Sequence, residues 1–147
     1  MTAERAKVLF LCTGNSCRSQ MAEGWARYLH HDEIEAYSAG TEQHGLNPNA
    51  VSVMNEAGVD ISGHQSKTLL DLAGIKFDYV ITVCSNADQN CPVFPGETEK
   101  RHRGFDDPPQ LARNASSTEE ELDIYRRVRD EIRAFIEDLP AWLKSRA

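Results

Sequence analysis

An apolar run that passes directly into a polar loop and then into a helical pattern places the strongest constraint on the fold of this chain. Residues 7–12 are mostly apolar and end in Thr13-Gly14-Asn15, which is typical of a buried strand entering a loop. From Ser19 onward, apolar residues recur at helical spacing, at Met21, Ala22, Trp25, Tyr28 and Leu29. The order strand, loop, helix is the first part of a βαβ unit, so it predicts an α/β fold.

The rest of the chain repeats this alternation. Strands are predicted over residues 35–39 and 77–84, with a weaker one near 102–105. Asn47-Pro48 starts a helix that ends at Gly58, Ser66 caps a short helix closed by Gly74, and Thr118 with Glu121 forms a capping box. The apolar face of that last helix runs on to Trp142. We therefore predict one domain over residues 1–147, with a four-stranded parallel sheet and helices on both faces.

Composition limits the kinds of partner. The 147 residues carry 16 basic and 23 acidic side chains, a net charge of −7, which argues against nucleic acid and anionic membranes. No apolar run approaches the roughly 20 residues that span a bilayer, and residues 1–7 lack the apolar segment of a secretory signal. We expect a cytoplasmic monomer, whose four cysteines are thiols, metal ligands or catalytic groups and not structural disulfides.

The loop from Cys12 to Ser19 predicts a site for a tetrahedral oxyanion. Its backbone N–H groups can converge on one centre at the N-terminus of the helix, and Arg18 adds a planar fork of donors. Gly14 is expected to permit a turn that other residues resist. The same field and the Ser19 hydroxyl are expected to lower the Cys12 pKa from about 8.5 to roughly 6. The alternative is that Cys12 is only a small buried apolar residue. The candidate binding residues are Thr13, Gly14, Asn15, Ser16, Cys17, Arg18 and Ser19.

A second thiol follows another predicted strand. Cys84 ends the strand over residues 77–84, and in parallel sheets the carboxyl ends of the strands share the edge where ligands bind. Cys91 follows after six residues, 85–90, of polar character. Two alternatives stay open: that Cys84 and Cys91 are incidental, or that they bind zinc with His102, although their gap exceeds the usual ligand spacing. Cys17 is interpreted as a packing residue.

The motif Cys12-Thr13-Gly14-Asn15-Ser16-Cys17-Arg18-Ser19 resembles the phosphate-binding loop of the low-molecular-weight protein tyrosine phosphatases, and its continuation to Gly24 resembles the thioredoxin-coupled arsenate reductases of that fold. The likeness continues through residues 37–40, 44–48, 83–88, 90–92 and 104–108. It implies that Cys12 attacks arsenate, that Cys84 and then Cys91 resolve the sulfur intermediates, and that thioredoxin reduces the final disulfide.

The resemblance also assigns supporting residues. It implies that Asp107, before Pro108, is the general acid, whereas the residues alone leave Asp106 as a near-equal candidate. In relatives Asn15, Glu23 and Ser38 match ligands of a potassium ion, so these are candidate cation-site remnants. The position of a further Asp ligand is Lys67 here, which makes potassium dependence doubtful, and no firm metal site or bound cofactor is predicted.

Two other functions stay open on the sequence. A phosphatase of the same fold would use Cys12 and Arg18, but Pro109-Gln110 stands where such enzymes often carry an aromatic pair. A non-enzymatic arsenite binder or sensor would use the three thiols as soft ligands, and would have no need of Arg18 or Asp107.

Overall fold

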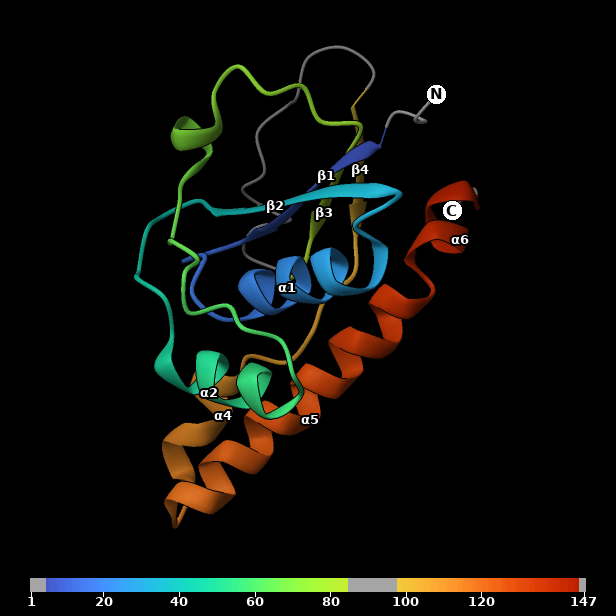
Figure 1. The fold of residues 1–147 in the computed structure, drawn as a ribbon. Coiled ribbons are helices and arrows are strands. Elements are labelled where there is room, and N and C mark those ends of the chain that lie inside the picture. The colour runs from blue at the N-terminus through green and yellow to red at the C-terminus, as the bar shows by residue number, and fades with distance from the viewer. Residues whose placement is uncertain (1–4, 85–97, 146–147) are drawn as a thin grey trace.

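The computed structural model describes residues 5–84 and 98–145 and has a four-stranded, all-parallel sheet at its centre (Figure 1). The strands are β1 (Ala6–Cys12), β2 (Ile34–Gly40), β3 (Tyr79–Thr82) and β4 (Glu99–His102), in the spatial order β2-β1-β3-β4. Cys12 pairs with Gly40 in register, and Leu11 pairs with Thr82. The carboxyl ends of the three neighbouring strands β2, β1 and β3 therefore lie at the same end of the sheet, and the all-parallel sheet confirms the predicted α/β class.

Helices flank the sheet. They are α1 (Arg18–His30), α2 (Pro48–Glu56), α4 (Pro108–Leu111), α5 (Thr118–Glu137) and α6 (Leu139–Lys144), with 3₁₀ turns η1 (Leu69–Leu72) and η2 (Ala112–Asn114). In Figure 1, α1 lies against the sheet and α5 runs diagonally beside α1, on which it packs, while η1 lies beyond β2 on the side away from α1. No helix in the described ranges is long and apolar enough to cross a membrane.

The core forms between β1, α1 and α5. Residues 8–12 of β1 are all buried, as expected for a central strand covered on both faces. Trp25 of α1 is fully buried, and α5 buries Tyr125, Val128, Ile132, Phe135 and Ile136 at helical spacing. This packing holds the N-terminus of α1 near the end of β1. The loop between them begins at Cys12, the last residue of β1, and ends at Arg18, the first residue of α1.

Three predicted helix boundaries were wrong for local reasons. Ser117, not Thr118, caps α5, because its hydroxyl accepts from the Glu120 N–H. The last helix breaks at Asp138, because Pro140 lacks an N–H and its ring excludes a continuous turn. Thr68, not Ser66, caps the turn over 69–72, with Asp71 returning the bond.

Two smaller boundary differences follow from strand pairing. The structure places β4 at Glu99–His102, earlier than the predicted 102–105, because pairing with β3 ends at His102. The ladder of β3 covers only the middle of the predicted strand over 77–84.

Candidate active site

The carbonyl groups of the loop after β1 accept hydrogen bonds from residues outside the loop. The carbonyls of Cys12, Thr13 and Gly14 accept from the backbone N–H groups of Thr41, Glu42 and His44, and Ser16 accepts from Asn47. In a trans peptide the N–H points opposite to the C=O, so the amides of residues 13, 14, 15 and 17 face the inside of the loop. This is the arrangement that an oxyanion site needs.

Asn15 and Gly14 shape this loop in ways that differ from the prediction. Gly14 does not have a positive φ; it is required because an added Cβ would lie 2.2 Å from the His44 ring. Asn15 is the residue with positive φ, 50°. Its buried amide donates to the Ser19 hydroxyl at 2.9 Å and accepts from Lys67 N–H at 2.7 Å. The side chain thus anchors the loop to a distant segment of the chain.

Cys12 and Cys84 lie within hydrogen-bonding contact of each other, and both thiols are buried. The Thr13 hydroxyl and the Cys84 sulfur share a further hydrogen bond of 3.3 Å. The ends of β1 and β3 therefore bring the two predicted thiols together. Cys91 lies outside the described residues.

The expected lowering of the Cys12 pKa is wrong for this arrangement. The hydrogen bond with Cys84, and then burial, raise the pKa of Cys12 well above its usual range, although Arg18 and the Thr13 N–H act in the opposite direction. The loop and Arg18 are visible in the sequence, whereas the contact between the two thiols depends on the pairing of β1 with β3. The Ser19 hydroxyl is engaged by Asn15.

Cys17 is buried in the hydrophobic core, and burial raises its pKa strongly. The thiol therefore stays protonated and packs in the core, as expected. Cys17 contributes to the oxyanion site only through its backbone N–H.

Arg18 lies at the junction of the loop and the segment before α4. Its guanidinium donates to the Phe105 carbonyl at 3.0 Å and lies 3.7 Å from the Asp107 carboxylate. Asp106 points instead to Arg127 on α5, at 3.2 Å. The two adjacent acids thus have different surroundings, and Asp107 is the one beside the loop.

The candidate cation-site residues form an internal ion-pair cluster. Glu23 is buried, accepts from the Ser38 hydroxyl at 2.5 Å and pairs with Arg27 at 2.9 Å. The Lys67 ammonium lies 4.0 Å from the same carboxylate. Asn15 Oδ1 already accepts from Lys67 N–H and Gln20. With these oxygens occupied by protein donors and a fixed ammonium beside them, the residues do not fit a potassium ion.

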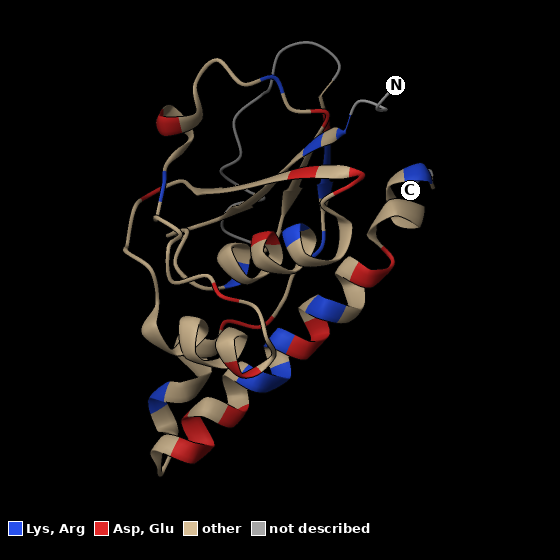
Figure 2. Cartoon of the chain, viewed as in Figure 1, with Lys and Arg blue, Asp and Glu red and all other residues tan. Residues whose placement is uncertain are grey.

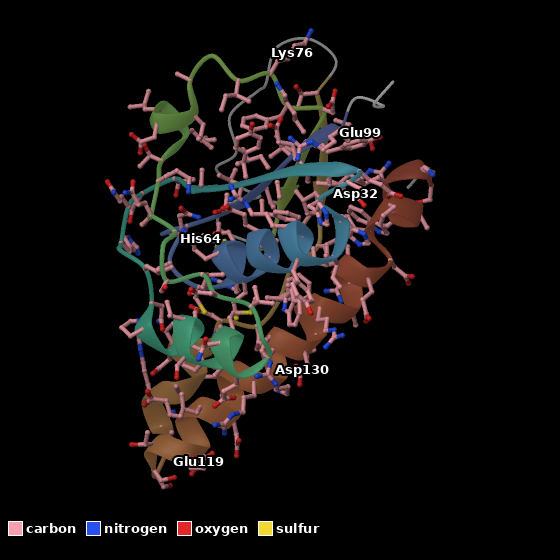
Figure 3. The ribbon with its side chains drawn as sticks, in the orientation of Figure 1. Asp32, His64, Lys76, Glu99, Glu119 and Asp130 are labelled. Atoms are coloured by element: carbon pink, nitrogen blue, oxygen red, sulfur yellow. The ribbon has the colours of Figure 1, made fainter. Side chains whose placement is uncertain are left out.

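Three supporting residues were not singled out from the sequence. His64 lies on the segment beside the start of α1 (Figure 3) and contacts the fully buried Gln20, which in turn donates to the Asn15 carbonyl. Burial lowers the pKa of His64, with Glu23 acting in the opposite direction. The Phe105 carbonyl supports Arg18. The contacts of His64 with Gln20 and of Phe105 with Arg18 join residues far apart along the chain, so neither has a local sequence signal.

The chain matches the low molecular weight phosphotyrosine protein phosphatase family over residues 7–146 and belongs to that family. Within it, the chain is 51% identical over 130 residues to the arsenate reductase of Shouchella clausii, covering 88% of this chain and 91% of that protein. It is 50% identical over 129 residues to the arsenate reductase of Bacillus subtilis, with 88% and 91% covered.

Solved structures agree. The chain has a TM-score of 0.76 and 32% identity to an arsenate reductase in the oxidized state, covering 94% of this chain and 98% of that one. A second arsenate reductase structure, in the phosphate-binding state, has a TM-score of 0.75 and 31% identity, with 95% and 99% covered. Both likenesses extend over nearly the whole domain.

Proposed function

We propose that this chain reduces arsenate to arsenite through a relay of Cys12, Cys84 and Cys91 whose final disulfide is reduced by thioredoxin. The contact between the Cys12 and Cys84 thiols inside the oxyanion loop carries the proposal. Hydrolysis of a phosphate ester needs one thiol, whereas reduction of As(V) needs two electrons, which a pair of adjacent thiols supplies on forming a disulfide. The arsenate reductase relatives support the same assignment.

The proposed reduction proceeds through three attacks by sulfur. The Cys12 thiolate attacks arsenic, and one arsenate oxygen leaves as water after it is protonated. The Cys84 thiolate then attacks the Cys12 sulfur. The pair of electrons of the sulfur–arsenic bond stays on arsenic, which leaves as arsenite, and a Cys12–Cys84 disulfide forms. Attack by Cys91 on Cys84 releases the Cys12 thiolate and leaves a Cys84–Cys91 disulfide for a dithiol such as thioredoxin.

The loop and its neighbours have distinct proposed roles. The inward amides of the loop and the Arg18 fork bind the oxyanion and stabilise its added charge. Asp107 protonates the departing oxygen, and its place 3.7 Å from Arg18 supports this role over that of Asp106, which pairs with Arg127. The Thr13 hydroxyl orients the Cys84 sulfur.

Arsenate-dependent oxidation of NADPH, coupled through thioredoxin and thioredoxin reductase, tests the relay. We expect multiple turnovers in the wild type and about one equivalent of arsenite in Cys91→Ser. Cys17→Ala is the matched control, because Cys17 packs in the core, and it should turn over. If turnover occurs only with a glutathione or mycothiol system, thioredoxin is not the reductant. Rapid hydrolysis of an aryl phosphate without arsenate turnover would show that the chain is a phosphatase.

A binding-only role is separated by Arg18. Arsenite is neutral near pH 7, so a thiol-based arsenite binder would tolerate Arg18→Gln. The relay instead needs Arg18 to hold an anion, and we expect this variant to lose arsenate reduction while it still folds.

We further propose that Lys67 supplies a built-in positive charge and that activity needs no potassium. The ammonium beside the buried Glu23 supports this. Arsenate turnover should be equal in sodium and potassium salts at matched ionic strength, and Lys67→Gln should lose activity or thermal stability. Strong activation of the wild type by potassium alone would contradict the assignment.

The same proposal gives arsenate as the substrate and thioredoxin as the reductant, with no nucleic acid or membrane partner. It also gives a monomer that acts in the cytoplasm. Light scattering of the purified chain tests the oligomeric state.

A further inference from the structure

A pocket opens directly beside the oxyanion loop. It has a volume of about 400 Å³ and is lined by Arg18, Arg103, Gly104, Phe105, Asp106 and Glu131. Arg18 is the loop's own guanidinium, so the pocket adjoins the place where an oxyanion binds. An anion that reaches Arg18 through this pocket passes the side chain of Arg103.

Phe105 holds Arg103 in position and links it to Arg18. The Arg103 guanidinium stacks over the Phe105 ring, 4.4 Å from its centroid, and donates to the Gly104 carbonyl at 2.6 Å. The carbonyl of the same Phe105 accepts from Arg18. Because Phe105 is buried, both arginines are attached to one rigid residue and the Arg103 head is preorganised at the pocket.

The charge of Arg103 is not neutralised by a described residue. Arg103 forms no ion pair within residues 5–84 and 98–145, although acidic and basic side chains alternate closely along the neighbouring α5 (Figure 2). One guanidinium serves both acids that line the pocket, since Arg127 pairs with Asp106 at 3.2 Å and with Glu131 at 2.9 Å, and neither acid pairs with Arg103. Arg103 is therefore a local source of positive potential on a chain of net charge −7.

From this geometry we infer that Arg103 guides the oxyanion substrate: it attracts arsenate into the pocket and delivers it to the loop and Arg18. This rests on the proposed function for the identity of the substrate. Arg103 does not contact the reacting atoms and acts on capture, so it should affect KM and not kcat.

The size of the effect follows from Coulomb's law. Arsenate carries about one to two negative charges near neutral pH, and a pocket of this volume is on the order of 8 Å across. In a water-like medium, removal of one positive charge at that distance raises KM about two- to fivefold. At about 500 mM salt the Debye length is shorter than the pocket, and the difference should almost vanish.

The experiment compares Arg103→Gln with Arg103→Lys and with Lys76→Gln. Arg103→Lys keeps the positive charge. Lys76 lies away from His64 and from the loop beside it (Figure 3), so Lys76→Gln makes the same change in net charge at a distance from the pocket. We expect the glutamine variant at position 103 to raise the arsenate KM two- to fivefold at about 20 mM salt with kcat unchanged. The lysine variant and Lys76→Gln should resemble the wild type.

A second readout does not depend on turnover. Inorganic phosphate, a tetrahedral oxyanion that thiols do not reduce, should protect Cys12 from alkylation by iodoacetamide when it binds in the loop, and Arg103→Gln should raise the half-protecting concentration by the same factor. If the wild type is protected but does not reduce arsenate, the proposed function fails while capture by Arg103 is still measured.

Three results would overturn the inference. An equal effect from Lys76→Gln would mean that net charge alone matters. A loss of kcat that is independent of salt would mean that Arg103 only supports the packing of Phe105. A raised KM for thioredoxin with an unchanged KM for arsenate would mean that Arg103 contacts the reductant instead.

Discussion

Replacement of Cys84 by alanine should lower the pKa of Cys12. The hydrogen bond between Cys12 and Cys84 is the largest cause of the raised pKa of Cys12, because a thiol that donates is held in its protonated form, and burial and Arg18 stay in place when Cys84 is removed. A net hydrogen bond contributes about 0.5–1.5 kcal/mol, and one pKa unit corresponds to about 1.4 kcal/mol. The pKa should therefore fall, and the thiolate fraction at pH 7 should rise about 2- to 13-fold.

The assay is the rate of Cys12 alkylation by iodoacetamide against pH, read by mass spectrometry of the Cys12 peptide. Cys91→Ser is the background, compared with the double variant that also carries Cys84→Ala. Cys17→Ala on the same background is the control and should leave the rate unchanged. An unchanged or slower Cys12 rate at pH 7 without Cys84 would refute the assignment of the raised pKa to the thiol pair.

Three further predictions concern the acid, the guanidinium and the buried histidine. Asp107→Asn should lower kcat for arsenate by about 10²–10⁴-fold, whereas Asp106→Asn, which breaks only the contact with Arg127, should stay near the wild type; equal losses would contradict the choice. Arg18→Lys should lower kcat/KM by about 10²-fold in steady-state assays, because one ammonium replaces neither the fork nor the bond to Phe105; full activity would show that a point charge suffices. Burial lowers the pKa of His64 below 6.5, so the unfolded chain binds the proton more readily than the folded one. The free energy of unfolding should therefore fall as pH drops below about 6.5. Urea titrations of His64→Gln should show a weaker fall, and an unchanged dependence on pH would assign the effect to another group.

The sequence by itself determined what depends on near neighbours. The apolar residues 8–12 form a buried strand, the polar loop follows, and the helical pattern after Arg18 forms α1, so the oxyanion loop was predictable from about 25 residues in a row. The cap and the proline of α2 at Asn47-Pro48 are equally local, and the Asn47 side chain accepts from two N–H groups as predicted. Short-range rules suffice there because both partners lie within one or two turns.

Boundaries were less predictable where two residues compete for one role. Ser117 and Thr118 are both good caps, and only the geometry of the first turn of α5 selects Ser117. The break before Pro140 had a local signal, which the continuous apolar face to Trp142 concealed.

Only the tertiary structure decided the chemistry between distant residues. The raised pKa of Cys12 arises because β1 and β3 are neighbours in the sheet and bring Cys84, 72 positions later, against the loop. Asp106 and Asp107 are adjacent in sequence, yet α5 offers Arg127 to one and the loop offers Arg18 to the other. Burial and hydrogen bonding depend on which segments meet in space, and the sequence pattern carries that information only through the complete fold.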